Sequence, residues 1–272
     1  MSHTPRPLIG RYVARPISFR RRLTLESLDA VRQGHYMLAL LELDVTDAQR
    51  AIERLQAAGT RVSLFAFVAK SIATALGEHP SLNAVRGGSK IYEFEDVDLN
   101  VPVELETRDG AAPHMLIVRQ VNRKSIEEIY ADIEQARNRF AASAAVSRED
   151  RSSQWLMRVL AWVPRFVRRA VLRALTRRPL MVKQMAGTVF LTSVAKFSGL
   201  RGFVVPYSAG PVASSFAVGS VTDKALVCDG TIQARRCLQL TAAFNHDLVD
   251  GSPAARFSAR LANLIEHPEW VN

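Results

Sequence analysis

His246 is the residue of this sequence best placed to move a proton. It follows residues 238–244, in which apolar and polar side chains alternate as along a β-strand, and it precedes Asp250, Gly251 and the start of a helical pattern. A histidine at the end of a strand, beside a tight turn, can act as a general base, since its ordinary pKa of about 6.5 lets it accept a proton at neutral pH. The same pattern is typical of a histidine that caps a helix or fills a core, so the residues alone leave both interpretations open.

Strands and helices alternate around this motif. A strand over residues 35–46 leads into a helix at which Thr46 and Gln49 form a predicted capping box, and a helix that is apolar on almost every side follows over residues 62–79. Short strands are predicted around residues 94–105 and 114–121, with a turn at Asp109 and Gly110 between them. The C-terminal third is rich in strand patterns, among them residues 212–221 and 224–230, and its last helix is predicted to start at an N-cap at Ser252, because proline follows it. We find neither an internal repeat nor a linker rich in Gly, Ser or Pro, so one α/β domain is the simplest prediction.

The sequence resembles a known family over almost its whole length. The segment FNHDLVDGSPAARFSARLANLIEHPE looks like the C-terminal signature of the dihydrolipoyl acyltransferase component of 2-oxoacid dehydrogenase complexes, and its His-x-x-x-Asp-Gly core is shared with chloramphenicol acetyltransferase. Other segments follow in the family's order: LLELDVT, VSLFAFVAKSIATALGEHPSLNA, DVDLNVPVE, VNRKSIEEI, AGTVFLTSV and AVGSVTDKALVCDGTIQARRCLQLTAAF. The resemblance implies a single chloramphenicol acetyltransferase-like α/β domain, with a mixed β-sheet flanked by helices.

The resemblance also implies a reaction. His246 matches the catalytic base, which deprotonates an acceptor thiol or hydroxyl so that it attacks the thioester carbonyl of an acyl-CoA. Thr192 matches the hydroxyl residue that hydrogen-bonds the oxyanion of the tetrahedral intermediate; Ser193 takes this role if the register differs by one residue, and an ordinary strand threonine is the alternative. Relatives are trimers whose active site lies between subunits, which implies a homotrimer or a higher assembly of trimers, with His246 of one chain facing Thr192 of the next.

Three further residues are implied to have structural roles at the active site. Asp250 matches a carboxylate that forms a salt bridge with an N-terminal arginine, and counting back from LLELDVT places this arginine at Arg20, with Arg21 or Arg22 as alternatives. We expect this pair to be buried, so that loss of either member would be strongly destabilising. Gly251 is expected to allow the tight turn into the last helix.

The sequence departs from the family's pattern at two places. The family usually has Asp-His-Arg around the base, whereas this chain has Asn245, His246 and Asp247. The glycine expected soon after the oxyanion hydroxyl is Ala195. These changes bear on acceptor specificity and geometry more than on the class of reaction.

The net charge of +10 resides in one segment. Residues 151–183 hold nine basic residues and no acidic residue, which leaves +1 for the rest of the chain, so we expect no nucleic-acid partner. Past Pro164, arginines recur every four residues beside a row of valines, which predicts a basic amphipathic helix over residues 164–178 in an insertion at about 145–185. This helix is expected to face a membrane surface, the phosphates of CoA or an acyl chain; alternatively, it packs on the domain with its arginines in solvent.

The sequence also bears on the cofactor and the acyl acceptor that we expect. The tetrapeptide around Lys224 looks like a lipoate-bearing motif, yet it lies inside the catalytic-domain match, so we expect no lipoate on this chain and coenzyme A, as acyl-CoA, as the substrate. The lead of residues 1–16 is too short for a lipoyl domain ahead of the acyltransferase domain at residues 17–272. The acceptor is therefore expected to be a lipoyl group on another protein, a small alcohol, an amine or a carrier-bound thiol.

Composition excludes several other classes. Apolar residues make up 48% of the chain, which argues against disorder, and no apolar run approaches the roughly 18 residues that a membrane span requires. The two cysteines, Cys228 and Cys237, cannot form a disulfide framework, and no spacing suggests a metal site. We expect a cytoplasmic protein, at most peripheral to a membrane. The alternatives to a CoA-dependent acyltransferase are a non-catalytic oligomeric scaffold that docks through its basic helix and an antibiotic-modifying acetyltransferase.

Overall fold

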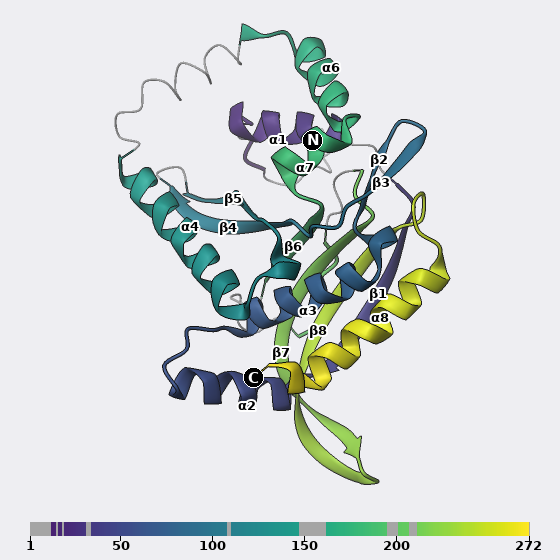
Figure 1. Ribbon diagram of the computed structural model, residues 1–272. Coiled ribbons are helices and arrows are strands. Elements are labelled where there is room, and N and C mark those ends of the chain that lie inside the picture. Colours follow the sequence, from purple (N-terminus) through teal and green to yellow (C-terminus); the bar gives the residue numbers. More distant parts are fainter. Residues whose placement is uncertain are drawn as a thin grey trace, which may run out of the picture.

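A mixed six-stranded sheet forms the centre of the molecule (Figure 1). The computed structural model describes residues 12–14, 16–17, 19–30, 34–107, 110–146, 162–194, 201–206 and 211–271. The strand order is β1-β8-β7-β6-β4-β5, in which β6 runs parallel to β4 and β7 and the other pairs are antiparallel. The bounds are β1 (Tyr36–Asp44), β4 (Leu99–Thr107), β5 (Gly110–Val118), β6 (Val189–Ser193), β7 (Ser214–Cys228) and β8 (Thr231–Asn245). This architecture confirms the predicted single α/β domain with a mixed sheet.

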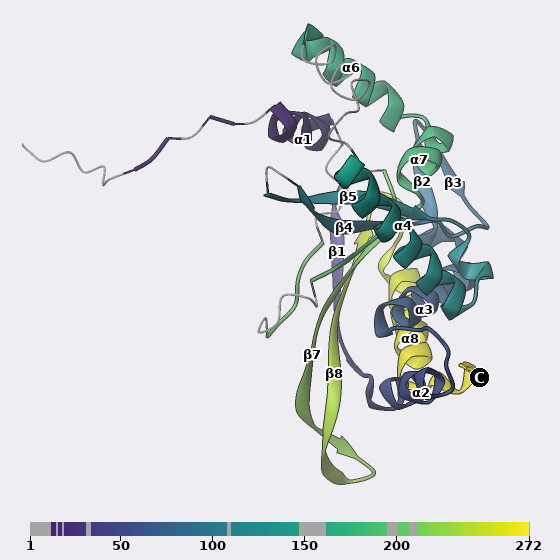
Figure 2. The ribbon, with the colours of Figure 1, turned by 90° about the vertical axis from the view of Figure 1, so that its left-hand side faces the viewer.

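Helices cover one face of this sheet, as Figure 2 shows. They are α2 (Thr46–Ala57), α3 (Leu64–Glu78), α4 (Ile126–Val146) and α8 (Gly251–Glu266). The central helix, α3, is buried along most of its length, and the side chain of Ser63 caps it by accepting a hydrogen bond from the Ala66 N–H at 3.2 Å. The prediction of a buried helix here is confirmed. The core lies between these helices and alternate side chains of β8, β7 and β6.

Two predicted helix caps are wrong. The N-cap of α2 is Val45, and the hydroxyl of Thr46 donates to Asp44 Oδ1 at 2.6 Å rather than closing a box with Gln49. Asp44 Oδ1 also accepts the Thr46 N–H at 2.9 Å, so the carboxylate at the end of β1 satisfies the helix start. Helix α8 has Asp250 as its N-cap, ahead of the predicted Ser252, because proline is tolerated throughout the first turn of a helix.

Strands β7 and β8 form a long hairpin that projects beyond the body of the domain (Figure 1). The two strand patterns predicted at residues 212–221 and 224–230 are one strand with a register shift between Val218 and Val221. Both cysteines are free and lie in this strand pair, as predicted. Lys224 also lies in β7, where its ammonium contacts the carboxylate of Glu42 on β1. The turn predicted at Asp109 falls outside the described residues.

A second group of helices lies at the opposite end of the sheet from the hairpin (Figure 1). It comprises α1 (Phe19–Ala30), α6 (Arg165–Thr176) and α7 (Pro179–Ala186), together with the hairpin of β2 (Ala84–Gly87) and β3 (Lys90–Glu93). Helix α1, which the sequence pattern did not predict, packs against α6. In the part of the chain that the structure describes, no helix is long and apolar enough to cross a membrane.

Candidate active site

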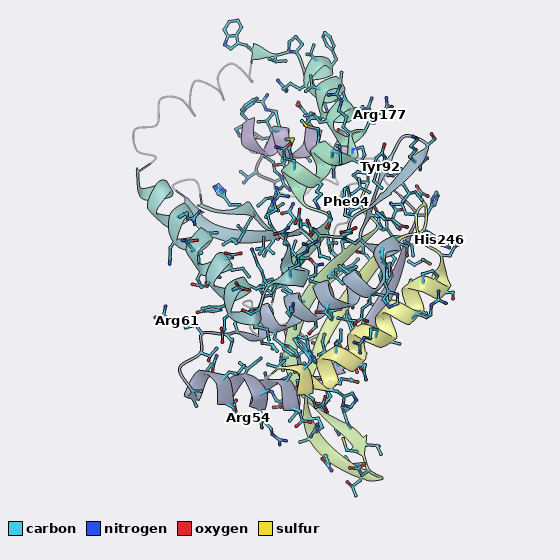
Figure 3. All side chains as sticks on the ribbon, viewed as in Figure 1. Arg54, Arg61, Tyr92, Phe94, Arg177 and His246 are labelled. Carbon is cyan, nitrogen blue, oxygen red and sulfur yellow. The ribbon has the colours of Figure 1, made fainter. Side chains whose placement is uncertain are left out.

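His246 lies directly after β8, at the turn into α8 and at the rim of the molecule (Figure 3). Its side chain is 50% exposed, and its Nδ1 lies 3.9 Å from Oδ1 of Asp250. Its backbone N–H donates to the carbonyl of His35 at 2.6 Å, which fixes the turn to the segment that precedes β1. The imidazole is therefore held on a fixed backbone, yet open to a proton donor from solvent or a substrate.

Asn245 holds this turn in place. Only 5% of the residue is exposed, and its N–H donates to the Ala213 carbonyl at 2.8 Å. Its side-chain Oδ1 accepts the Asp247 N–H at 3.0 Å, and its carbonyl accepts the N–H groups of Leu248 and Val249. One buried residue thus joins Ala213 to the backbone that follows the histidine. This role of Asn245 was not predicted from the sequence.

Asp247 joins the histidine turn to two other segments. Its Oδ1 lies 2.9 Å from Nδ1 of His35, and its Oδ2 lies 3.7 Å from the guanidinium of Arg86 on β2. A carboxylate thus lies between two basic groups directly after the histidine. Neither His35 nor Arg86 was identified from the sequence.

Thr192 and Ser193 lie at the C-terminal end of β6, far from His246 of the same chain. Thr192 is level with Ala217 of β7 and, through it, with Thr241 of β8, which is five residues before His246. At about 3.4 Å per residue and 4.8 Å per strand, the separation is roughly 17 Å along the strands and 10 Å across them. Side chains alternate between faces, so Thr192 points away from the helix-covered face that Leu191 lines.

The structure bears on the three expected structural residues to different degrees. In the single chain, the side chain of Asp250 is 88% exposed. The side chain of Arg20 lies outside the described residues, so its pairing with Asp250 stays a prediction; Arg22 lies over the ring of Phe19, 5.9 Å from its centroid.

Gly251 is not required for the turn. A Cβ at this position would approach no atom more closely than the sulfur of Met37 at 4.0 Å, and the backbone is not in the left-handed region. At Gly34, in contrast, a Cβ would lie 2.7 Å from Oδ1 of Asn245. The close approach that needs a glycine thus lies ahead of β1, at a position for which the sequence predicted no role.

The family model of the 2-oxoacid dehydrogenase acyltransferase catalytic domain matches residues 11–153 and 168–271, which include the whole of this site. The chain belongs to this family. Residues 154–167, just before and at the start of α6, are left unmatched. The acyltransferase-like domain expected from the sequence is therefore confirmed, with the segment that departs from the family lying ahead of α6.

Individual relatives of the acyltransferase family agree over most of the chain. The lipoamide acyltransferase component of the branched-chain alpha-keto acid dehydrogenase complex of Pseudomonas aeruginosa is 25% identical over 257 residues, 93% of this chain and 51% of that protein. The dihydrolipoyllysine-residue acetyltransferase of the Mycoplasma pneumoniae pyruvate dehydrogenase complex is 26% identical over 208 residues, 76% of this chain and 42% of that protein. The chain thus spans about half the length of these relatives.

Solved structures of acyltransferase domains share the fold. A probable dihydrolipoamide acetyltransferase of Listeria monocytogenes has a TM-score of 0.69 at 19% identity and covers 94% of both chains. The dihydrolipoamide acetyltransferase of Azotobacter vinelandii, studied for the catalytic role of a serine, a histidine and an asparagine, also has a TM-score of 0.69, at 18% identity over 98% of both chains. The cubic core of a pyruvate dehydrogenase multienzyme complex has a TM-score of 0.66, at 18% identity over 98% of both chains.

Proposed function

We propose that the protein is a CoA-dependent acyltransferase that moves an acyl group from acyl-CoA directly to an acceptor. The observation that carries this proposal is His246, half-exposed on a fixed turn within the matched catalytic domain. Its imidazole takes the proton of an acceptor thiol, hydroxyl or amine, and the acceptor's lone pair attacks the thioester carbonyl. The tetrahedral intermediate then collapses, the bond to the CoA sulfur breaks, and the imidazolium returns its proton to the departing thiolate. No bond to the enzyme forms.

The oxyanion of that intermediate is stabilised by Thr192 of a second copy, or by Ser193 if that hydroxyl faces the site. The separation of roughly 17 Å along the strands prevents Thr192 and His246 of one chain from meeting at a single carbonyl carbon. A site shared between copies removes this conflict, because Thr192 lies on the face of the sheet opposite the helices. A homotrimer, alone or in a larger assembly of trimers, is the arrangement that we propose.

Release of free CoA, followed with a panel of acyl-CoAs and acceptors, tests the reaction. We expect His246→Ala to lower kcat by about 10²–10⁴-fold, the usual contribution of a general base. Undiminished transfer by this variant would contradict the assignment. The acceptor panel includes lipoamide, small alcohols, amines and hydroxylated antibiotics, because the same chemistry serves each of them.

Mixing two inactive variants tests the shared site. In a trimer reassembled at random from equal amounts of His246→Ala and Thr192→Ala protein, about a quarter of the interfaces combine an intact histidine with an intact threonine. We expect about a quarter of the wild-type activity to return after unfolding and joint refolding. A mixture that stays inactive, although each variant still forms trimers, would contradict a site built from two chains.

A second candidate function is contact with an anionic membrane surface, which α6 favours. Trp162, Phe166 and Val171 expose apolar side chains around this helix. The family model leaves residues 154–167 unmatched, so we propose that the insertion expected within about 145–185 lies in this stretch and includes only the start of α6. Arg173 and Arg177 have no acidic partner among the described residues, whereas Arg165 and Arg169 face Asp29 of α1 at 3.6 and 3.2 Å.

Sedimentation with vesicles that contain anionic lipid tests this contact. We expect Arg173→Glu combined with Arg177→Glu to reduce the bound fraction, since these two arginines are not committed to α1. Equal binding by this double variant would contradict membrane docking by α6. A protein that binds vesicles but transfers no acyl group would favour the scaffold over the enzyme.

A further inference from the structure

A polar hollow of about 540 Å³ lies between α4 and the loop that joins α2 to α3. Its volume is within the range of small-molecule pockets, about 300–1,000 Å³. Arg61 is the lining residue that the loop supplies. The others form two rows along α4, each with a spacing of four residues: Tyr130, Glu134 and Asn138, and Ala131, Gln135 and Arg139. At 1.5 Å per residue, the hollow follows α4 for about 14 Å.

Most of the polar side chains in this hollow are free to bind a ligand. Arg61 and Arg139 form neither an ion pair nor a side-chain hydrogen bond within the described residues, and the same is true of Tyr130, Gln135 and Asn138. Tyr130 is half-buried and the other four are exposed, so their polar ends can be reached from solvent. Guanidinium, phenol and amide groups all donate hydrogen bonds. The hollow therefore presents converging donors.

The hollow is also positively charged. Glu134 is the acidic residue among those that line it, and its Oε1 lies 2.6 Å from Nη1 of Arg137, a neighbour outside the lining. This ion pair offsets the charge of the carboxylate. Arg61 and Arg139 then face the hollow without a negative charge to balance them in the part of the chain that the structure describes. Two positive charges that line one hollow attract an anion.

Both sides of the hollow are held in place by the fold. The side-chain amide of Gln56 donates to the carbonyl of Val62 at 2.9 Å, which fixes the loop next to Arg61. Val62 is buried in the main core, and so are Ile129 and Ile133, which attach α4 to the same core. A ligand that binds here therefore does not have to order the loop or the helix, so less of its binding energy is lost.

The hollow is remote from the candidate active site. Arg61 and His246 lie on opposite sides of the molecule, with α3 between them (Figure 3). A ligand in the hollow is therefore not the thioester on which His246 is proposed to act. Binding here is independent of the proposed reaction.

We propose that this hollow binds a phosphate ester, with its phosphate between Arg61 and Arg139 and its organic part along α4. A phosphate monoester carries a charge of about −1.5 to −2 at neutral pH, which matches two arginines, and its three terminal oxygens accept from several donors at once. A single carboxylate has one charge and two oxygens, so it would leave one arginine unpaired. The length of the hollow leaves room for more than a phosphate group alone. The site adds a second ligand to the proposed function.

Calorimetric titration at constant ionic strength tests the class of ligand. The probes are glucose 6-phosphate and phenyl phosphate, each beside its carboxylate counterpart, glucuronate and benzoate, with inorganic phosphate as the reference. We expect at least one phosphate ester to bind more tightly than inorganic phosphate and about tenfold more tightly than its counterpart, because the second arginine is then paired.

Three substitutions test the location. Arg61→Gln and Arg139→Gln should each weaken binding of the phosphate ester about tenfold, the usual loss for a hydrogen bond to a charged group. Tyr130→Phe keeps the ring and should weaken it about two- to tenfold. Arg54→Gln is the matched control, because Arg54 is an exposed arginine of α2 outside the hollow (Figure 3). It should change the affinity by less than about twofold, since distant exposed charges are screened.

Equal losses for Arg54→Gln and Arg61→Gln would overturn the proposal, because only the net charge would then matter. Equal binding of phosphates and carboxylates, or no binding of either phosphate ester, would do the same. So would an assembly that dissociates in Arg61→Gln, measured by light scattering, while phosphate binding is kept, because a second copy would then cover the hollow. His246→Ala protein should bind the phosphate ester as wild type does, so failure of the proposed reaction and failure of this site are seen separately.

Discussion

The His246 turn and helix α6 are held by different interactions. At the His246 turn, hydrogen bonds to the backbone converge on buried Asn245, and the histidine's own N–H is bonded to the carbonyl of His35. At α6, a charged pair holds the helix: both oxygens of Glu26 on α1 accept from Arg168, at 2.6 and 2.7 Å. The proposed base thus lies on a turn fixed largely by main-chain hydrogen bonds, whereas α6 is attached through side chains.

This difference bears on the proposed reaction. A general base loses rate when it moves by an ångström, so a network of main-chain hydrogen bonds is the appropriate support. Side chains of α6 can be changed one at a time without disturbing that network. The small cluster of Val85, Val182 and Val212 under α7, separate from the main core, fits such a semi-independent unit. Substitutions at the His246 turn and at α6 can test the difference between the two regions.

Loss of the Asn245 side chain should have the largest effect. Asn245→Ala leaves the Asp247 N–H without its acceptor and frees the turn, so we expect about a 10²-fold loss of kcat, with KM changed much less. Steady-state kinetics measure this split. Asn245→Asp keeps an acceptor oxygen and should retain most of the activity. If the alanine variant is as active as wild type, the Asn245 side chain is not what positions the base.

Gly34→Ala should destabilise the same turn from the other side. The added Cβ would lie 2.7 Å from Asn245 Oδ1, and that buried side chain has little room to move. We expect a loss of about 1–3 kcal/mol in the free energy of unfolding, as for other overpacked sites. Urea denaturation gives the value. Stability equal to wild type would show that the turn yields more easily than its hydrogen bonds suggest.

Glu26→Gln should loosen α6 without affecting the base. The hydrogen-bonded guanidinium of Arg168 lowers the pKa of the Glu26 carboxyl, so this pair stabilises the fold above the carboxyl's ordinary value of about 4.3 and loses its effect as pH falls through the lowered pKa. We expect faster amide exchange in α6 at neutral pH and a melting temperature below that of wild type. The difference should shrink as melts are taken from pH 7 towards pH 3.

Asp29→Asn is the control for this pair, because Asp29 is more exposed and its contacts with Arg165 and Arg169 are longer, at 3.6 and 3.2 Å. It should change the melting temperature less than Glu26→Gln does. A melting difference for Glu26→Gln that is the same at all pH values would mean that charge is not what holds α6 to α1.

Gly251→Ala should have the smallest effect. The position has an ordinary backbone conformation, and an added Cβ meets only the Met37 sulfur at 4.0 Å. Replacing glycine in the first turn of α8 reduces the entropy of the unfolded chain, so we expect stabilisation of about 0.4–1 kcal/mol. A thermal melt beside Gly34→Ala makes the comparison direct. Destabilisation would restore the special role that the sequence motif suggested for this glycine.

Much of the secondary structure could be predicted from the periodicity of apolar residues. The buried helix α3 and the strand that ends at His246 both carry strong patterns, and both are where those patterns place them. The caps at the starts of the helices were less predictable. Thr46 had two possible partners, Gln49 and Asp44, and its hydroxyl is bonded to Asp44 instead of forming a capping box with Gln49. The exposure of Asp250 in the single chain could not be predicted, since exposure depends on which segments cover a turn and not on the turn's own residues.

The basic segment shows the same limit. Its repeat predicts an amphipathic helix from about residue 164, yet Arg168, which is outside the main arginine row, is the residue that pairs with buried Glu26. Val171, in the row of valines, is exposed. Which side of α6 faces inward is decided by its packing against α1, a helix with no clear pattern of its own. Leu172 and Leu175 also face inward, where they line a pocket against α7.

The sequence by itself determined the family, the single α/β domain and the histidine at the end of a strand, because local periodicity and ordered motifs are properties of contiguous residues. Only the tertiary structure decided that Thr192 lies some five strand positions from His246 and that Asn245 supports the turn. Each of these depends on strands that are brought into register from distant parts of the chain.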